Sequence, residues 1–196
     1  MNLIENIKIK IGKRMLQKET ATLQRTRDLF NLTTTRTAGI LYEASSVEDY
    51  ELIKKFVGYL KEFGIKTKVI GYFSRKEIPE FTYSKLDYSF FNKKELNWYM
   101  KPPLSSSSSI EKFIYEEIDV LIDLNIYDYF PLKYISALSK AKFKIGQYSD
   151  ENKPVYDMMI EADSSKGVKY FLRQVDIYLQ MINKKEETTN IEKQNP

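Results

Sequence analysis

From residue 37 onward the chain alternates short apolar runs with amphipathic segments, and this alternation constrains the fold more than any other feature. Residues 37–43 and 65–73 have the composition of buried strands. The segment between them predicts a helix that Ser46 caps at its start and Gly64 ends. A strand, a helix and a second strand in this order predict a right-handed βαβ unit with parallel strands.

The same alternation continues to residue 183. We predict further strands at 87–91, 118–124 and 142–147, and an antiparallel edge strand at 155–161 after a polar turn. Helices are expected at 110–117, from Pro131 to about Lys140, and at 167–183. The last helix is expected to bury Tyr170, Phe171, Val175, Tyr178, Leu179 and Ile182. The predicted fold class is therefore α/β: a three-layer Rossmann-like domain whose mostly parallel sheet has about five strands plus the antiparallel edge strand.

The first 36 residues differ from the rest in charge. They hold eight basic and three acidic residues, a net charge of +5, whereas the whole chain carries +4. Ile4, Ile7, Ile11 and Met15 recur at three- and four-residue steps and so share one helical face. We expect residues 2–28 to form one amphipathic basic helix, or two if Gly12 breaks it. The predicted organisation is a basic helical arm at 1–36, one α/β domain at 37–183 and a disordered polar tail at 184–196.

Three interpretations of the arm follow from this pattern. The helix could pack its isoleucine face on the domain and leave its lysines in solvent. It could instead lie on an anionic membrane surface, or contact the phosphates of a ribonucleoprotein, through residues 1–28. In the last two cases the predicted contacts with the anionic partner are Lys8, Lys13, Arg14 and Lys18.

The absence of histidine and cysteine excludes whole classes of chemistry. Without them the chain has no Ser-His-Asp or Cys-His nucleophile, no disulfide, no iron–sulfur cluster and no ordinary zinc site. No cofactor or metal is expected. The chain has no run of about 18 apolar residues, which is the length that a helix needs to cross a membrane. The first residues also lack the features of a secretory signal. The expected location is the cytoplasm, with peripheral association at the inner face of the membrane as the alternative.

Ligands of open α/β sheets bind beyond the carboxyl ends of the strands. The predicted cleft residues there are Glu43, Ser45, Arg75, Asp123, Asn125 and Asp128. The first strand-to-helix turn holds no glycine and begins with an acidic residue, which argues against a dinucleotide or phosphate site. Asp123 and Asp128 could converge on a divalent metal, but two carboxylates fall short of a hard-cation site. The favoured interpretation of Asp123 is a hydrogen bond to the loop that follows it.

Residues 72–99 are rich in aromatic side chains, with nine in 28 positions. Trp98 and Tyr99 lie between lysines and could form a stacking surface for a base or a sugar. The alternative is a satellite aromatic core under an irregular connection. The five serines that follow at 105–109 predict a flexible loop.

Two resemblances add to this interpretation. Residues 117–124, 130–139 and 141–146 resemble one βαβ stretch of the heptosyltransferase-type glycosyltransferases, in a strand that ends in Asp-Leu, a helix and an Ala-Lys…Gly strand. That family implies two Rossmann-like domains with the nucleotide sugar bound mainly by the second, and this chain has room for one. No catalytic residue is carried over.

The whole chain is similar to a family of small bacterial proteins of unknown function. The shared segments are residues 41–49, 84–87, 90–99, 121–124 and 130–140. This resemblance implies no activity. The sequence therefore favours a non-catalytic α/β domain that acts by macromolecular binding through its basic arm. A glycosyltransferase-like domain with a cleft at the strand ends is the alternative, and the oligomeric state stays undetermined.

Overall fold

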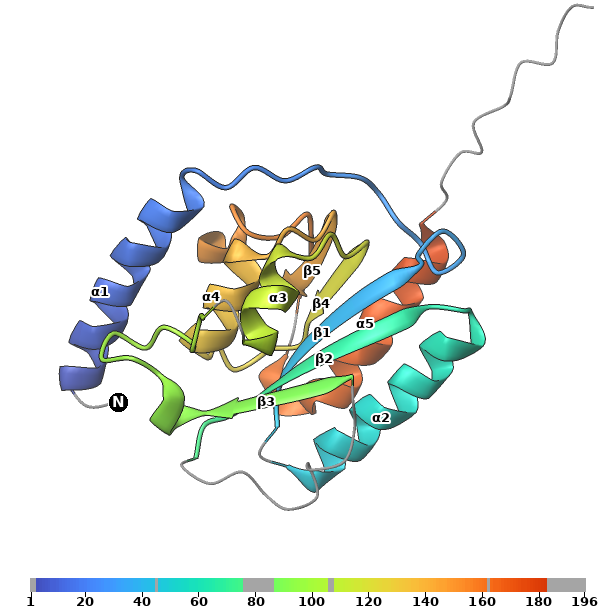
Figure 1. Ribbon diagram of the computed structural model, residues 1–196. Helices are drawn as coiled ribbons and strands as arrows, with labels where there is room; N and C mark the ends of the chain where they lie inside the picture. Colours follow the sequence, from blue (N-terminus) through green and yellow to red (C-terminus); the bar gives the residue numbers. More distant parts are fainter. Residues whose placement is uncertain (1–2, 45, 76–86, 106–107, 162, 183–196) are drawn as a thin grey trace, which may run out of the picture.

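The computed structural model describes residues 3–44, 46–75, 87–105, 108–161 and 163–182. Its centre is one six-stranded sheet with helices on both faces (Figure 1). The strands are β1 (Thr37–Glu43), β2 (Lys66–Phe73), β3 (Tyr88–Asn92), β4 (Val120–Asp123), β5 (Phe143–Gln147) and β6 (Met158–Ile160). Their order in the sheet is β3-β2-β1-β4-β5-β6, and every neighbouring pair is parallel. This is the strand order of Rossmann folds, so the predicted fold class is confirmed.

The helices cover the two faces in different sets. Helices α2 (Val47–Glu62) and α5 (Gly167–Met181) bury their apolar sides on one face, against β1, β4 and β5. Helices α3 (Ser109–Tyr115) and α4 (Phe130–Leu138) cover the other face, and α1 (Leu3–Thr20) packs on α4 from outside. Leu121, in the central strand β4, has no exposed surface, as a strand covered on both faces requires.

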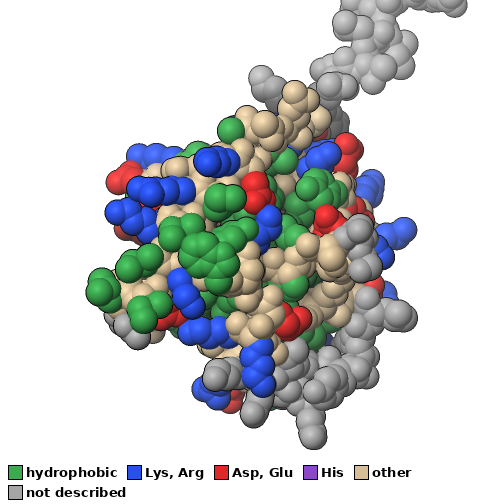
Figure 2. All heavy atoms as spheres, turned by 60° about the vertical axis from the view of Figure 1, so that its left-hand side comes forward, with side chains coloured by type: hydrophobic (Ala, Val, Ile, Leu, Met, Phe, Trp, Pro, Cys, Tyr) green, Lys and Arg blue, Asp and Glu red, His purple; other side chains and the backbone are tan. Residues whose placement is uncertain are grey.

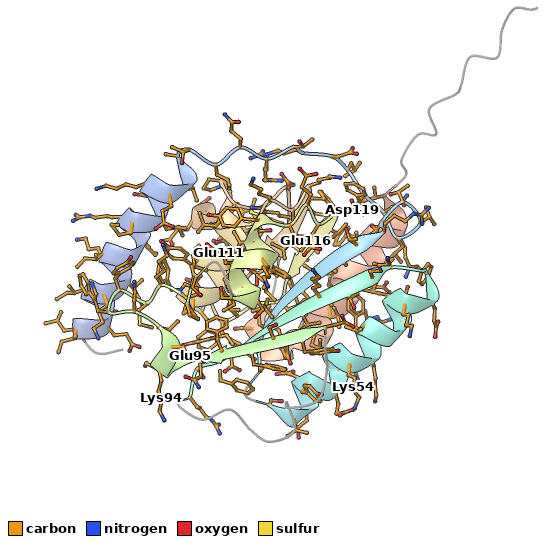
Figure 3. All side chains as sticks on the ribbon, viewed as in Figure 1. Lys54, Lys94, Glu95, Glu111, Glu116 and Asp119 are labelled. Carbon is orange, nitrogen blue, oxygen red and sulfur yellow. The ribbon has the colours of Figure 1, made fainter. Side chains whose placement is uncertain are left out.

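The first βαβ unit forms as the sequence predicts. The Ser46 hydroxyl accepts a hydrogen bond from the Asp49 N–H and so caps α2. Gly64 follows the helix with a φ of 74°, a conformation that favours glycine. Strands β1 and β2 then pair in parallel over their whole length. At the amino-terminal end of β4, the Asp119 carboxylate accepts hydrogen bonds from the backbone N–H groups of Arg36 and Thr37 and so fixes where β1 begins (Figure 3).

The predicted antiparallel edge strand is wrong, because β6 runs parallel to β5. The connection includes the short turn η3 (Asp150–Asn152) and then crosses back over the face of β5. Gly146 makes this crossing possible: a Cβ atom there would lie 2.5 Å from the ring of Tyr156. The polar turn at 149–153 suggested a hairpin. The chain instead crosses β5, and the Tyr156 ring occupies the space beside Gly146 that a side chain at this position would fill.

Of the two alternatives for the first helix, the one with a break near Gly12 is wrong, and the helix is shorter than the predicted 2–28. Helix α1 is continuous and ends at Thr20, and residues 21–36 that follow contain no helix. Gly12 is a point of close approach, since a Cβ there would lie 2.5 Å from both the Phe130 ring and the Tyr99 carbonyl oxygen. Glycine therefore allows α1 and α4 to pack closely, and its position in the helix reflects tertiary contact rather than a kink.

Two smaller predictions need correction. Helix α5 buries Val168 and Leu172 in place of Tyr170 and Tyr178, which are 36% and 43% exposed. Ser108 and Ser109 do not belong to a loop, because Ser108 caps α3 and Ser109 is its first residue. Residues 106–107 and the predicted tail at 184–196 lie outside the described residues.

Candidate functional site

The predicted cleft residues are divided between two places in the fold. The Glu43 carboxylate, at the end of β1, accepts hydrogen bonds from the Ser74 hydroxyl and N–H at 2.9 and 3.3 Å, on the β2 side of the strand. Arg75 is exposed beside Ser74, and Ser45 lies outside the described residues. Asp123, by contrast, points under α4. A role of these residues in ligand binding stays a prediction.

Asp123 is the centre of a buried polar network. One of its carboxylate oxygens accepts hydrogen bonds from the Ser136 hydroxyl on α4 and from the Tyr156 hydroxyl, the latter at 2.6 Å. The other oxygen accepts from the Asn125 N–H at 3.0 Å, which is the loop contact that the sequence favoured over a metal. Burial raises the pKa of the Asp123 carboxyl, while these three hydrogen bonds oppose the shift.

Asn125 and Asp128 shape the loop that leads into α4. The side-chain amide of Asn125 donates to the Tyr129 carbonyl at 2.9 Å, and its oxygen accepts from the Tyr129 N–H at 2.8 Å. Asp128 has a φ of 53°, and its exposed carboxylate lies 3.5 Å from the ammonium of the buried Lys133. The structure thus brings Asp123 and Asn125 together and places Asp128 at the surface, two residues before α4.

Lys144 is the functional candidate that the sequence analysis missed. It is the second residue of β5 with 1% of its surface exposed, and its ammonium donates to the Ser136 and Ala137 carbonyls at 2.8 and 3.3 Å. Burial lowers its pKa from 10.5 to about 7, and nearby Arg25 adds to the shift. The predicted strand 142–147 alternates lysine with apolar residues at its start, so no sequence signal separates Lys144 from a solvent-facing lysine.

The aromatic-rich segment serves mainly as core. Tyr72, Phe73 and Phe91 are buried, and Tyr72 packs on Phe91 with ring centroids 5.0 Å apart. Phe81 and Tyr83 lie outside the described residues. Trp98 differs from the rest: it is 61% exposed and meets only the edge of Tyr99 among the ring contacts of the described residues.

Helix α1 is docked on the domain by ion pairs along its length. The ammonium of Lys93 lies 2.9 Å from Glu5, and that of Lys101 lies 2.8 Å from Glu19. Glu19 also accepts a hydrogen bond from the Tyr134 hydroxyl at 2.7 Å. In Figure 3, Lys94 and Glu95 mark the turn η2 (Lys93–Glu95) beside the amino-terminal part of the helix.

The face of α1 that meets the domain is not the isoleucine face. Glu5, Ile9, Gly12, Leu16 and Glu19 form the packed side, in steps of three and four residues. Leu3, Ile4 and Ile7 turn away from the domain and are 73%, 61% and 51% exposed. The first interpretation of the arm is correct in that the helix packs on the domain, but it is wrong about the face: Ile4 and Ile7 point outward, and Ile11 and Met15 are half-buried.

Basic residues accompany this outward face. Lys10, Arg14 and Lys18 are exposed, whereas the Lys13 ammonium lies 2.6 Å from Glu151 of the domain. Lys8 is partly exposed at the margin. Figure 2, which brings the α1 side forward, shows apolar side chains with lysine and arginine side chains around them. The outward face of α1 thus combines large aliphatic groups with positive charge.

The fold and these features define a single-sheet, Rossmann-like α/β protein with a docked amphipathic helix. The chain belongs to the DUF6913 family, a family of unknown function whose model matches residues 8–182. No curated protein and no solved structure matches the chain. The expected membership in a family of unknown function is thereby confirmed, while the likeness of residues 117–146 to glycosyltransferases gains no support.

Two features that the described residues lack bear on the kind of site. None of the described helices is both long and apolar enough to cross a membrane. Within the same part of the chain, no three acidic side chains are grouped so that they could hold a metal ion. Two features of the described residues are not explained by the fold alone: the outward face of α1 and the buried Lys144.

Proposed function

We propose that this protein binds anionic membrane surfaces through the outward face of α1. The observation that carries the proposal is the exposure of Leu3, Ile4 and Ile7 on a helix whose opposite side is already packed. Large aliphatic side chains gathered on one exposed face mark an interaction site, because burying each one contributes about 1.5–3 kcal/mol.

The neighbouring charges favour a lipid surface as the occupant. Lys10, Arg14 and Lys18 are exposed on the same side of the helix. Each such cation near an anionic leaflet contributes about 1 kcal/mol. A nucleic acid would use these charges but would leave the aliphatic groups in water, whereas a lipid surface takes up both.

The ion pairs with the domain make α1 a preformed binding element. Because Glu5 and Glu19 are held by Lys93 and Lys101, the helix does not have to fold at the membrane. Lys13 pairs with Glu151, so we assign the lipid contacts to Lys8, Lys10, Arg14 and Lys18. Lys10 was absent from the residues that the sequence proposed.

Co-sedimentation with phosphatidylcholine vesicles, with and without phosphatidylserine, tests this proposal. The wild type should bind only vesicles that contain phosphatidylserine, and added salt should weaken the binding. A variant with Lys10→Gln, Arg14→Gln and Lys18→Gln should lose about 100-fold in affinity, from about 1 kcal/mol per charge. A variant with Ile4→Ser and Ile7→Ser should lose binding while keeping every charge.

A matched control removes the same charge elsewhere. Lys55, Lys61 and Lys169 are exposed on α2 and α5, on the opposite side of the sheet, and their replacement by Gln should leave vesicle binding unchanged. Trp98, the one tryptophan of the chain, is already 61% exposed, so far-ultraviolet circular dichroism checks that the variants stay folded. The membrane proposal would be contradicted if the variant with Ile4→Ser and Ile7→Ser bound vesicles as tightly as the wild type. It would also be contradicted if the wild type bound ribosomes but not vesicles.

A further inference from the structure

A hollow of about 570 Å³ lies between α1 and the domain, away from the outward face of the helix. The second half of α1 forms one wall, and α4 and the chain around η3 form the others. Leu16, Leu23, Phe130 and Val155 give it an apolar lining. Such a space is within the size range of small-molecule sites, which are mostly apolar with a few placed polar groups.

The polar group placed in this hollow is Lys144. It forms part of the wall although almost none of its surface is exposed. A lysine ammonium has three N–H donors, and among the described residues two carbonyl oxygens, of Ser136 and Ala137, accept from it. One donor is left for a ligand. The acidic group that acts on this amine is Asp157, which Arg25 and Arg27 already pair, so an anion bound beside the buried ammonium would be stabilised.

The remaining charges of the hollow are largely committed to the protein. The Arg25 guanidinium donates to the Ala141 and Lys142 carbonyls and to Asp157. Lys13 and Lys133 both pair with Glu151. Arg27 also lines the rim; its side chain is 66% exposed and its Nε lies 3.6 Å from Asp157, so the rim keeps one solvent-facing guanidinium. In the buried part of the hollow, the third N–H of Lys144 is the donor left for a ligand.

We propose that this hollow binds a small amphiphilic anion with one carboxylate on an aliphatic body, the carboxylate accepting a hydrogen bond from Lys144. The apolar lining takes the aliphatic body and the spare N–H takes one oxygen. A phosphate dianion would need several donors at the same depth, and the committed side chains do not supply them. The lining of the hollow includes none of the α1 residues that we assign to the membrane face, so this site is independent of membrane binding.

Calorimetric titration with sodium octanoate tests the proposal, with octanol and inorganic phosphate as comparison probes. Octanoate should bind the wild type, and Lys144→Met should weaken it about tenfold or more, since the charged hydrogen bond is lost. Octanol, which lacks the charge, should bind both proteins equally. Lys169→Met, on the far face of the molecule, removes a lysine outside the hollow and should leave octanoate affinity unchanged.

A second variant keeps Lys144 in place. Val155→Asp adds a carboxylate to the wall and should weaken octanoate by like-charge repulsion, without a comparable effect on octanol. The variant with Ile4→Ser and Ile7→Ser should bind octanoate like the wild type, which separates this site from the membrane face. The proposal is overturned if octanoate does not bind the wild type, or if it binds Lys144→Met and Val155→Asp as tightly as the wild type. Phosphate that binds as tightly as octanoate overturns the assignment to a single carboxylate.

Discussion

Lys144 should make the stability of the protein depend on pH in a direction opposite to that of an ordinary lysine. Burial, with Arg25 as the second cause, holds its pKa at about 7, while the unfolded chain restores the value of 10.5. Between these two values the unfolded state binds more protons than the folded state, so the free energy of unfolding rises with pH. The penalty for the buried charge is fully present below pH 7 and is relieved as the pH increases.

The size of this effect follows from the two pKa values. One pKa unit corresponds to about 1.36 kcal/mol, so from about pH 7.5 to about pH 9.5 the free energy of unfolding should rise by about 2.5 kcal/mol. The charged groups around the amine are Arg25, Arg27 and Asp157, and its hydrogen-bond partners are the α4 carbonyls. The buried tyrosines Tyr72 and Tyr88 have pKa values raised above 10.0, so they do not titrate in this window.

Urea denaturation of the wild type and Lys144→Met at several pH values measures the effect. Methionine has similar length and no charge, so the difference between the two curves isolates Lys144 from all other titrating groups. The wild type should gain about 2.5 kcal/mol relative to the variant across the window. Curves that run parallel would refute the argument, because they would show that the amine keeps its ordinary pKa in the folded state.

Three further predictions concern packing. Gly12→Ala should loosen the docking of α1, because the added Cβ meets the Phe130 ring and the Tyr99 carbonyl oxygen at 2.5 Å, and amide hydrogen exchange should show faster exchange in 3–20. Gly58→Ala is the control, since nothing lies within 4 Å of its Cβ position, and it should stabilise α2 by about 0.5–1 kcal/mol in thermal unfolding. Leu121→Ala should cost about 2–5 kcal/mol in denaturant unfolding, and a loss below about 1 kcal/mol would contradict its central position. Tyr156→Phe should destabilise by about 1–3 kcal/mol, because the Asp123 carboxylate loses a buried donor, and an unchanged melting temperature would show that this hydrogen bond contributes nothing.

The sequence by itself determined the elements and the central topology. The apolar runs at β1, β2 and β4, the Ser46 cap and Gly64 predicted a parallel βαβ unit, because these signals are local in the chain. Asp123 was correctly interpreted as a residue that holds its loop, since a carboxylate at a strand end commonly bonds the next backbone N–H groups. The positive charge of the first 36 residues was also plain from composition.

Only the tertiary structure decided which faces these elements present. Gly12 looked like a helix breaker, and the Phe130 ring, 118 residues later, gives it a different role. Ile4 and Ile7 point outward because the other side of α1, with Gly12 and Leu16, packs on α4. A row of branched side chains could not approach α4 as closely. Likewise β6 became parallel through Gly146 and Tyr156, and Lys144 gained its burial from α4. Each outcome depends on contacts between segments distant in sequence, and periodicity within one segment carries no information about its neighbour.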